Sequence, residues 1–175
     1  LEGKVVDLGE TCGSTLEIEL LKRTPSSYLG SCRYKLPTYI EAPEVYAKLF
    51  KVLDQLDIGY FFYIGGNDSM DTVNKLSEYF REIDFDVKVI GIPKTIDNDL
   101  VGTDHTPGYG CAAKYVATTL QEIVRDCAVY TVPAVTIVEV MGRDAGWLTA
   151  AAALPRVTGG YAPDLVYLPE RAFDL

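Results

Sequence analysis

Short apolar runs alternate with segments of helical spacing along most of this chain. Residues 58–64 and 87–92 are continuous aliphatic and aromatic runs, which are typical of strands buried on both faces of a sheet. Two similar runs, at 135–141 and 164–168, predict further strands. Apolar residues three or four apart predict helices, at about 43–56, after 67–69, at 110–127 and at 146–154. Because strands that alternate with helices form βαβ units, we expect one α/β domain over residues 1–175, a three-layer αβα sandwich with a mainly parallel sheet.

Length, charge and cysteine content limit the class of protein. The 175 residues suffice for a domain with a core, and a hydrophobic content of 48% is typical of globular proteins. The net charge of −9 argues against nucleic acid as a partner, and no apolar run approaches the roughly 20 residues that cross a membrane. The four cysteines lack the spacing of metal ligands, so we expect free, mostly buried thiols in a reducing compartment, with a cytoplasmic location. Since the chain begins at Leu1 without Met, we expect either a removed leader or a piece of a longer protein.

The segment 91–102 concentrates residues that can carry chemistry. It follows a predicted strand, and open α/β sheets bind ligands at the carboxyl ends of their strands. A cation, a hydroxyl and two carboxylates lie close together in it: Lys94, Thr95, Asp97 and Asp99. An extended backbone would place both carboxylates on the same side. The set predicts phosphate chemistry, with the lysine for phosphoryl oxygens, one carboxylate as a base and the other for a cation or its waters; the alternative is a solvated lysine beside two Asx turns.

Residues 65–69 (GGNDS) form a second candidate loop, between a predicted strand and a helix. Gly65 and Gly66 let the backbone approach a ligand, and the helix that follows offers N–H groups to an anion. Asn67 and Asp68 could instead be simple capping residues. Asp68 is unusual at a phosphate site, because its carboxylate repels phosphate unless a metal ion or a lysine lies between them.

Two further segments offer an arginine. In 139–146, Gly142 provides a turn after a predicted strand, Arg143 provides a fork for phosphate or carboxylate, and Asp144 could cap the next helix. The alternative for Arg143 is a structural ion pair with an aspartate. Before residue 41 the sequence predicts a loop containing Gly and Ser, in which residues 30–33 could form an anion-holding turn.

Four segments together resemble motifs of the phosphofructokinase family: 29–33 (LGSCR), 65–69 (GGNDS), 93–99 (PKTIDND) and 141–144 (MGRD). Their order and separation match that family over essentially the whole chain, and the last two together are highly specific. NAD and diacylglycerol kinases share only a Gly-Gly-Asp-Gly-type turn and match less well. The resemblance implies a phosphofructokinase-like fold and phosphoryl transfer to fructose 6-phosphate in glycolysis.

The resemblance implies a role for each matching position. Asp97 would be the base that accepts the proton of the C1 hydroxyl of fructose 6-phosphate, with Thr95 and Asp99 beside the transferring phosphoryl group. The sugar phosphate would contact residues of two segments: Thr95, Ile96, Asp97, Met141, Gly142 and Arg143. The phosphoryl donor would contact another set: Gly65, Gly66, Ser69 and Arg33. Mg²⁺ is the implied cofactor, near Asn67.

Two charged residues favour pyrophosphate over ATP as the donor. ATP-dependent members of the family usually have glycine at the positions of Asp68 and Lys94, whereas the pyrophosphate-dependent branch has charged residues there. The Asp68 carboxylate would repel the α-phosphate of ATP, and Lys94 would neutralise the leaving phosphate of pyrophosphate. The implied enzyme is therefore a pyrophosphate-dependent phosphotransferase; an ATP-dependent 6-phosphofructokinase and a non-catalytic phosphosugar-binding module are the alternatives.

Three features depart from the family pattern. Asn67 stands where the family usually has a metal-associated aspartate, and a neutral amide holds Mg²⁺ less strongly. Ala134 replaces an arginine that in many members reaches a neighbouring subunit's sugar site. The Gly-rich turn after the family's first strand and the whole C-terminal sugar-phosphate half are missing, so we expect a central fragment, from the N-terminal (phosphoryl-donor) half of a longer enzyme that would be a homo-oligomer, a dimer or a tetramer.

Overall fold

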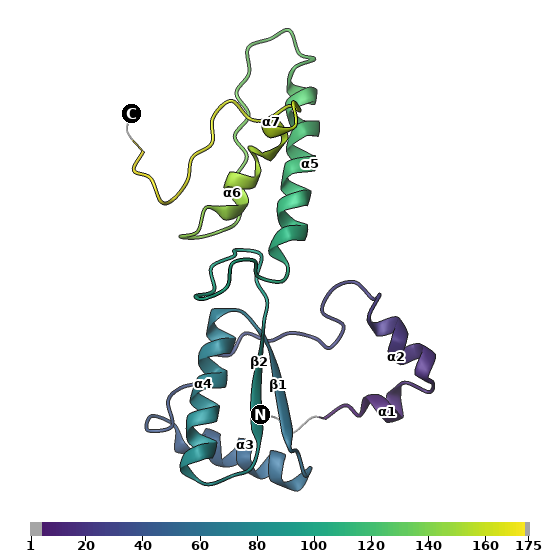
Figure 1. The fold of residues 1–175 in the computed structure, drawn as a ribbon, viewed down its shortest axis with the longest axis vertical. Helices are drawn as coiled ribbons and strands as arrows, with labels where there is room; N and C mark the ends of the chain where they lie inside the picture. Colours follow the sequence, from purple (N-terminus) through teal and green to yellow (C-terminus); the bar gives the residue numbers. More distant parts are fainter. Residues whose placement is uncertain (1–4, 174–175) are drawn as a thin grey trace. The chain divides into compact units, whose positions relative to one another are not determined.

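The computed structural model describes residues 5–173, which fall into two compact units. The first unit contains the described residues up to Phe61 and the segment Asn74–Val89; the second contains Phe62–Val73 and the described residues from Ile90 onward. The elements follow in the order α1 (Leu8–Thr11), α2 (Thr15–Leu21), α3 (Pro43–Gln55), β1 (Tyr60–Gly65), α4 (Asn67–Glu82), β2 (Lys88–Pro93), α5 (Tyr109–Cys127), α6 (Trp147–Ala151) and α7 (Leu154–Val157) (Figure 1). Both strands therefore begin in the first unit and end in the second.

The core of the first unit packs α3 against the second half of α4 and the start of β2. Pro43 lies in the first turn of α3, where its missing N–H is not needed. Tyr46 and Phe80 are each only 1% exposed, and the Tyr46 hydroxyl donates to the Pro37 carbonyl at 2.8 Å. The other buried members of this cluster are Leu36, Leu53, Leu76, Tyr79 and Val87. Truncating a buried aromatic such as Phe80 to alanine costs about 3–5 kcal/mol, so this cluster anchors the strands at their amino ends.

β1 and β2 form a two-stranded parallel sheet with α4 as the crossover between them. At one end of the ladder Lys88 N donates to Gly59 O at 2.9 Å, and at the other Lys94 N donates to Gly65 O at 2.9 Å. The residue offset is the same at both ends, as a parallel pair requires. The ladder therefore ends where the two candidate loops begin.

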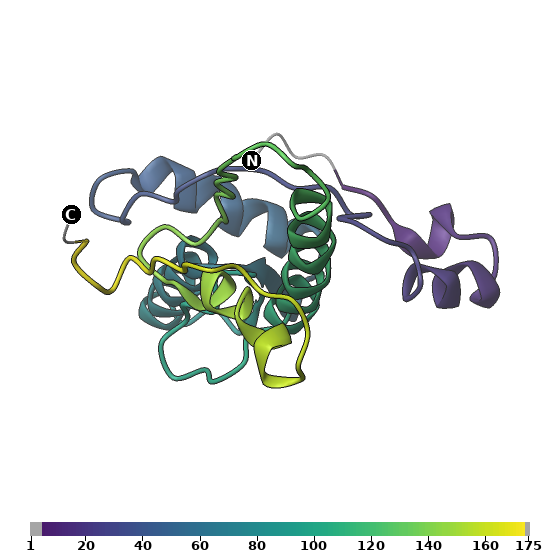
Figure 2. The same ribbon diagram turned by 90° about the horizontal axis from the view of Figure 1, so that it is seen from above.

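Small residues allow close packing in the second unit. A Cβ added at Gly91 of β2 would lie 2.8 Å from Met70 Sδ, so glycine lets the first half of α4 approach the strand. α6 and α7 lie along α5, as both ribbon views show (Figure 2), and Ala113, Leu148 and Ala151 form the buried contact between α5 and α6.

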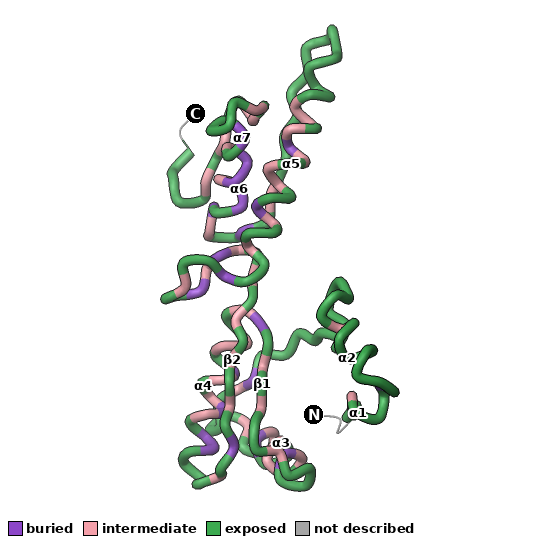
Figure 3. The backbone as a smooth tube through the Cα atoms, turned by 45° about the vertical axis from the view of Figure 1, so that its right-hand side comes forward, coloured by how far each residue is buried: buried purple, intermediate pink, exposed green. Residues whose placement is uncertain are grey.

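Two predicted strands are wrong. Residues 135–141 and 164–168 are irregular, and within the described part of the chain neither pairs with another strand. Val135 and Ile137 are each 89% exposed, in the exposed stretch that follows α5 in Figure 3. Their apolar side chains fit a strand, but a strand also needs a neighbour for its N–H and C=O groups.

β1 is buried on one face only, where the sequence predicts burial on both. Phe61 and Tyr63 are half-buried, whereas Tyr60, Phe62 and Ile64 are 67%, 56% and 55% exposed. A continuous apolar run shows that a strand suits burial on both faces; whether both are covered depends on the elements packed around it.

The helix predictions have mixed outcomes. α3 and α5 confirm the predicted helices at 43–56 and 110–127, and α4 confirms the one after 67–69. The single helix predicted over 146–154 is two short helices, α6 and α7, with Pro155 in the first turn of α7. Pro155 has no N–H to donate to the carbonyl of Ala151, so a continuous helix would lack that hydrogen bond.

The loop predicted before residue 41 contains two short helices, α1 and α2. Asp7 Oδ1 accepts from Gly9 N at 2.7 Å, and Ser14 Oγ accepts from Glu17 N at 3.3 Å, so side chains cap both first turns. Neither helix buries a residue, so apolar spacing gave no signal for them.

Cysteine burial and helix length complete the description. Cys12 is buried, whereas Cys32, Cys111 and Cys127 are exposed, so the prediction of mostly buried thiols is wrong. Across residues 5–173, no helix combines the length and apolar character needed to span a bilayer.

Candidate active site

The loop after β2 is closed by Asn98, which lies between the two predicted aspartates. Asn98 is 5% exposed and has a φ of 56°, a left-handed conformation that asparagine adopts more readily than most residues. Its Oδ1 accepts from Thr106 N at 2.8 Å, and its Nδ2 donates to Asp104 O at 3.1 Å. A second closure joins Thr95 N to Pro107 O at 3.1 Å. The loop is thereby fixed directly at the carboxyl end of β2.

Asp97 lies in this loop with one carboxylate oxygen unused. Its N–H donates to Thr95 Oγ1 at 3.1 Å. Its Oδ1 is buried and has no hydrogen-bond partner within residues 5–173. A buried acceptor without a partner costs about 1–3 kcal/mol, so this oxygen is suited to accept a hydrogen bond from a bound hydroxyl. The backbone between Asp97 and Asp99 is not extended, because Asn98 has a positive φ, so the condition for placing both carboxylates on the same side is not met.

Asp99 joins three segments of the chain. Its Oδ2 accepts from Asn67 Nδ2 at 2.9 Å and lies 3.8 Å from Arg143 Nη2. The loop after β2, the start of α4 and the segment of Arg143 therefore meet at Asp99, although residues 135–141 form no strand. Arg143 forms the ion pair that was the alternative to a ligand contact. The Arg143 side chain is 75% exposed, so this pair contributes at most about 1 kcal/mol.

The Gly-Gly turn starts α4 and lies against the loop after β2. Ser69 N donates to Gly66 O at 3.0 Å. A Cβ at Gly65 would overlap Ser69 Oγ, so only glycine fits there. A Cβ at Gly66 would lie 3.6 Å from Lys94 O, which places the two loops in contact through their backbones. Asp68 and Lys94 are both exposed, and their contact with a phosphoryl donor stays a prediction.

The Met-Gly-Arg segment presents two exposed side chains around a buried glycine. Met141 is 68% exposed, and Arg143 also extends into solvent. Ala145 N donates to Gly142 O at 2.8 Å, and a Cβ at Gly142 would overlap Ala145 O. Glycine is therefore required for the turn that presents Arg143 to Asp99.

Three residues that shape these loops were not predicted: Asn98, Thr106 and Glu170. The sequence predicts Asp144 as the cap of α6, which is wrong, because Gly146 N donates to Glu170 Oε1 at 2.6 Å instead. The preference of asparagine for left-handed backbone is a signal that could have identified Asn98. The partners of Thr106 and Gly146 lie 8 and 24 residues away, beyond the reach of a local pattern.

Arg33, the remaining predicted donor residue, lies in the first unit. It is exposed and follows a turn in which Gly30 has a φ of 82° and Gly30 N donates to Ser27 O at 2.8 Å. The observed turn therefore ends at Gly30, whereas residues 30–33, where the turn was predicted, are irregular. The contact of Arg33 with a phosphoryl donor stays a prediction.

The residues present do not fit a Mg²⁺ ion held by the protein alone. Mg²⁺ takes oxygen ligands in octahedral geometry at about 2.0–2.1 Å. Residues 5–173 contain no group of three or more His, Cys, Asp or Glu side chains placed to hold a metal. Asp99 Oδ2 faces the Asn67 amide nitrogen and the Arg143 guanidinium, which are hydrogen-bond donors and not ligands. A cation here would need further oxygen ligands, such as waters or the phosphate oxygens of a substrate.

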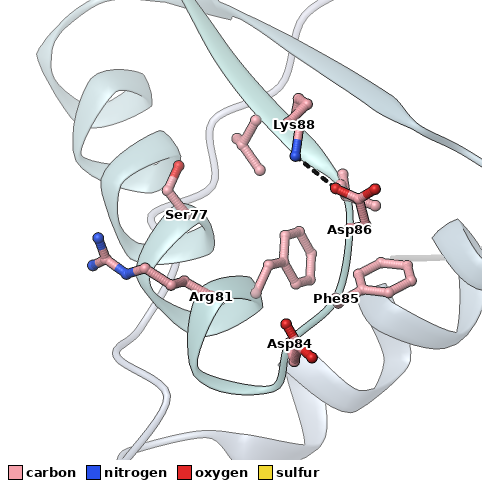
Figure 4. A pocket seen from close by; sticks show the side chains of 9 residues that line it. Ser77, Arg81, Asp84, Phe85, Asp86 and Lys88 are labelled. Carbon is pink, nitrogen blue, oxygen red and sulfur yellow. Dashed lines mark hydrogen bonds and ion pairs between the residues drawn. The ribbon is translucent and has the colours of Figure 1, made fainter.

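A cavity of about 420 Å³ opens in the first unit between the end of α4 and the start of β2 (Figure 4). Its charged lining includes Arg81, Asp84 and the pair Asp86–Lys88, whose Oδ1 and Nζ atoms are 2.6 Å apart. This hydrogen bond lowers the pKa of Asp86 and raises the pKa of Lys88. No predicted site residue lines the cavity, which lies at the end of β2 opposite Lys94.

Comparisons with known proteins agree with the motifs. The family model described as Phosphofructokinase matches residues 5–175. The chain belongs to the phosphofructokinase family. This phosphofructokinase-family chain is 49% identical to the pyrophosphate–fructose 6-phosphate 1-phosphotransferase of Rhodospirillum rubrum, over 93% of this chain and 38% of that protein. It is 46% identical to the protein of the same name from Xanthomonas campestris (92% and 39%) and 35% identical to an ATP-dependent 6-phosphofructokinase of Glaesserella parasuis (85% and 41%).

A solved structure confirms the fold. The crystal structure of a pyrophosphate-dependent phosphofructokinase from Marinobacter aquaeolei superimposes with a TM-score of 0.83 at 39% identity, covering 99% of this chain and 42% of that one. The chain therefore has a partial phosphofructokinase-like α/β fold, as predicted. It spans about two-fifths of the length of the curated relatives named above, at 38%, 39% and 41%.

Proposed function

We propose that the protein containing this chain transfers a phosphoryl group from pyrophosphate to the C1 hydroxyl of fructose 6-phosphate, giving fructose 1,6-bisphosphate and phosphate, a step of glycolysis. Residues 1–175 would belong to the phosphoryl-donor half of that protein. The observation that carries the proposal is Asp97 Oδ1, a buried carboxylate oxygen without a partner in the described residues, in a loop fixed at a strand end. A substrate hydroxyl supplies the missing hydrogen bond.

The reaction needs a base and an in-line displacement. Asp97 accepts the proton of the C1 hydroxyl while the hydroxyl oxygen attacks the terminal phosphorus of pyrophosphate. The new C1–O–P bond forms as the bond to the leaving phosphate breaks. Thr95 Oγ1 accepts from Asp97 N and so helps to orient the base. Lys94 offsets the charge that develops on the leaving phosphate.

The choice of pyrophosphate rests on two residues and on the relatives. Asp68 lies in the first turn of α4, where its carboxylate repels the additional phosphate of ATP. The relatives named for pyrophosphate are 46% and 49% identical to this chain, and the ATP-dependent relative is 35% identical, which supports the same choice.

A coupled assay of the full-length protein with each donor tests the proposal. We expect turnover with pyrophosphate and little with ATP. The double substitution Asp68→Gly with Lys94→Gly should then give measurable ATP use. Asp86→Asn with Lys88→Gln is the matched control, because it removes one charge of each sign at the other end of β2. A wild type that prefers ATP would contradict the choice of donor, and sugar-phosphate binding without turnover would favour the binding-module alternative.

The proposal also covers the cofactor, the oligomeric state, the location and the partners of the full-length protein. We propose that Mg²⁺ acts while bound to pyrophosphate oxygens, that the full-length protein is a cytoplasmic homo-oligomer, a dimer or a tetramer, and that nucleic acids and membranes are not partners. Light scattering of the full-length protein would measure the oligomeric state, and a monomer would contradict that part of the proposal.

A further inference from the structure

The carboxylate of Asp99 is compensated by donors from two other loops. An ionised carboxylate only accepts hydrogen bonds, so the Asn67 side chain must present its nitrogen to Asp99 Oδ2, at 2.9 Å. Arg143 Nη2 lies 3.8 Å from the same oxygen. One neutral donor and one cation therefore stand around Asp99, and both belong to this chain.

We propose that Asn67 is a positioning residue that takes the place of a protein-bound divalent cation at Asp99. This inference rests on the proposed phosphotransfer function. A second carboxylate in contact with Asp99 would repel it, and such pairs are tolerated best beside a cation. The amide of Asn67 removes the repulsion and supplies a hydrogen bond instead. The substrate-free protein therefore holds no divalent cation at Asp99, and the cation enters with pyrophosphate.

The position of Asn67 links the orientation of Asp99 to the proposed reaction. Asn67 is the first residue of α4, directly after the Gly-Gly turn, and Arg143 follows Gly142 on the proposed sugar-phosphate segment. Asp99 lies between them, two residues after Asp97. Without the amide, Arg143 is the remaining charged partner of the Asp99 carboxylate within residues 5–173, and it lies on the proposed sugar-phosphate segment and not on the Gly-Gly turn.

Cation binding without substrates is the first test. Mn²⁺ is titrated into the substrate-free full-length protein and the free ion is measured by electron paramagnetic resonance. We expect Asn67→Asp to bind Mn²⁺ at least ~10-fold more tightly than the wild type, because it creates a pair of carboxylate ligands. An aspartate at the start of α4 is favourable to the helix, so this variant should fold.

The chain offers a matched control on the same helix. Asn74 Nδ2 donates to Glu78 Oε1 at 3.0 Å, so Asn74→Asp also creates an exposed pair of carboxylates, outside the site. We expect this control to bind Mn²⁺ as the wild type does. Equal Mn²⁺ affinity in the Asn67→Asp and Asn74→Asp variants would overturn the proposal.

The positioning role is tested by Asn67→Ala. We expect kcat with pyrophosphate to fall about 10-fold, as loss of one hydrogen bond to a charged group allows, with the Mn²⁺ affinity of the substrate-free protein unchanged. If the kcat of Asn67→Ala lies within twofold of the wild-type kcat, Asn67 is not a positioning residue. The role is also overturned if the substrate-free wild type binds Mn²⁺ at a site that is lost in Asn67→Ala. A wild type inactive with pyrophosphate would instead refute the proposed function, since the Mn²⁺ titrations involve no turnover.

Discussion

Replacing Asn98 with alanine is expected to open the loop that carries Asp97 and Asp99. The substitution removes the hydrogen bonds from Thr106 N at 2.8 Å and to Asp104 O at 3.1 Å. Thr106 is 2% exposed, so its N–H would stay buried without a partner, at a cost of about 1–3 kcal/mol. Alanine would also have to keep the φ of 56°, and a left-handed backbone costs most residues roughly 1–2 kcal/mol.

Native-state hydrogen exchange of the full-length protein measures this effect at the Thr106 amide. The two costs together are about 2–5 kcal/mol, which corresponds to exchange faster by roughly 30- to 5000-fold, if the loop opens locally. Asn98→Gly is the matched control, because it loses the same two hydrogen bonds but adopts a positive φ without strain. Its Thr106 amide should exchange several-fold more slowly than in Asn98→Ala. Unchanged exchange in Asn98→Ala, or equal rates in the two variants, would refute the reasoning.

Three further substitutions test other parts of the structure. Gly65→Ala places a Cβ on the Ser69 side chain and should lower the free energy of unfolding of the full-length protein by about 1–3 kcal/mol, as measured by thermal unfolding. If Gly65→Ala causes the same loss in a Ser69→Gly background, this clash is not the cause. Asp97→Asn in the full-length protein should reduce kcat by orders of magnitude while sugar-phosphate affinity, measured by calorimetry, is kept; turnover within a few-fold of wild type would rule out Asp97 as the base. Hydrogen bonds from Thr38 Oγ1 and N at 2.7 and 2.8 Å lower the pKa of Glu41 below its usual 4.5. The stability that this carboxylate contributes is therefore present above pH 4.5 and is lost as the pH falls through the lowered pKa. In the Glu41→Gln variant, the urea midpoint of unfolding should therefore decline less in acid than in the wild type. Identical pH profiles of the two proteins would contradict this prediction.

Patterns that lie within one segment could be read from the sequence. α5, at Tyr109–Cys127, was predicted to within one residue, because its apolar spacing belongs to the helix itself. The segment 135–141 has the composition of a strand but no ladder, since pairing depends on a second segment. Likewise, β1 has the sequence of a doubly covered strand and one exposed face.

In the candidate site, too, some features could be predicted from single segments and others depend on contacts between segments. The structure brings Arg143 Nη2 to 3.8 Å from Asp99 Oδ2, although the apolar run before Arg143 forms no strand and only Asp99 follows a strand of the sheet. The bond that orients Asp99 could not be predicted, because it comes from Asn67, 32 residues earlier in the chain. As the first residue of a helix, Asn67 could equally have been a cap, and only the tertiary structure decides between the two partners.

The close approach of α4 to β2 restricts the order in which substitutions can accumulate in descendants of this protein. A side chain at Gly91 would meet Met70 Sδ at 2.8 Å and Met70 Cε at 3.2 Å. A lineage that first shortens residue 70 accepts Gly91→Ala without rearrangement, whereas in the reverse order the flexible end of the Met70 side chain must move aside. The two positions should therefore covary among relatives, with a larger residue at 91 beside a smaller one at 70.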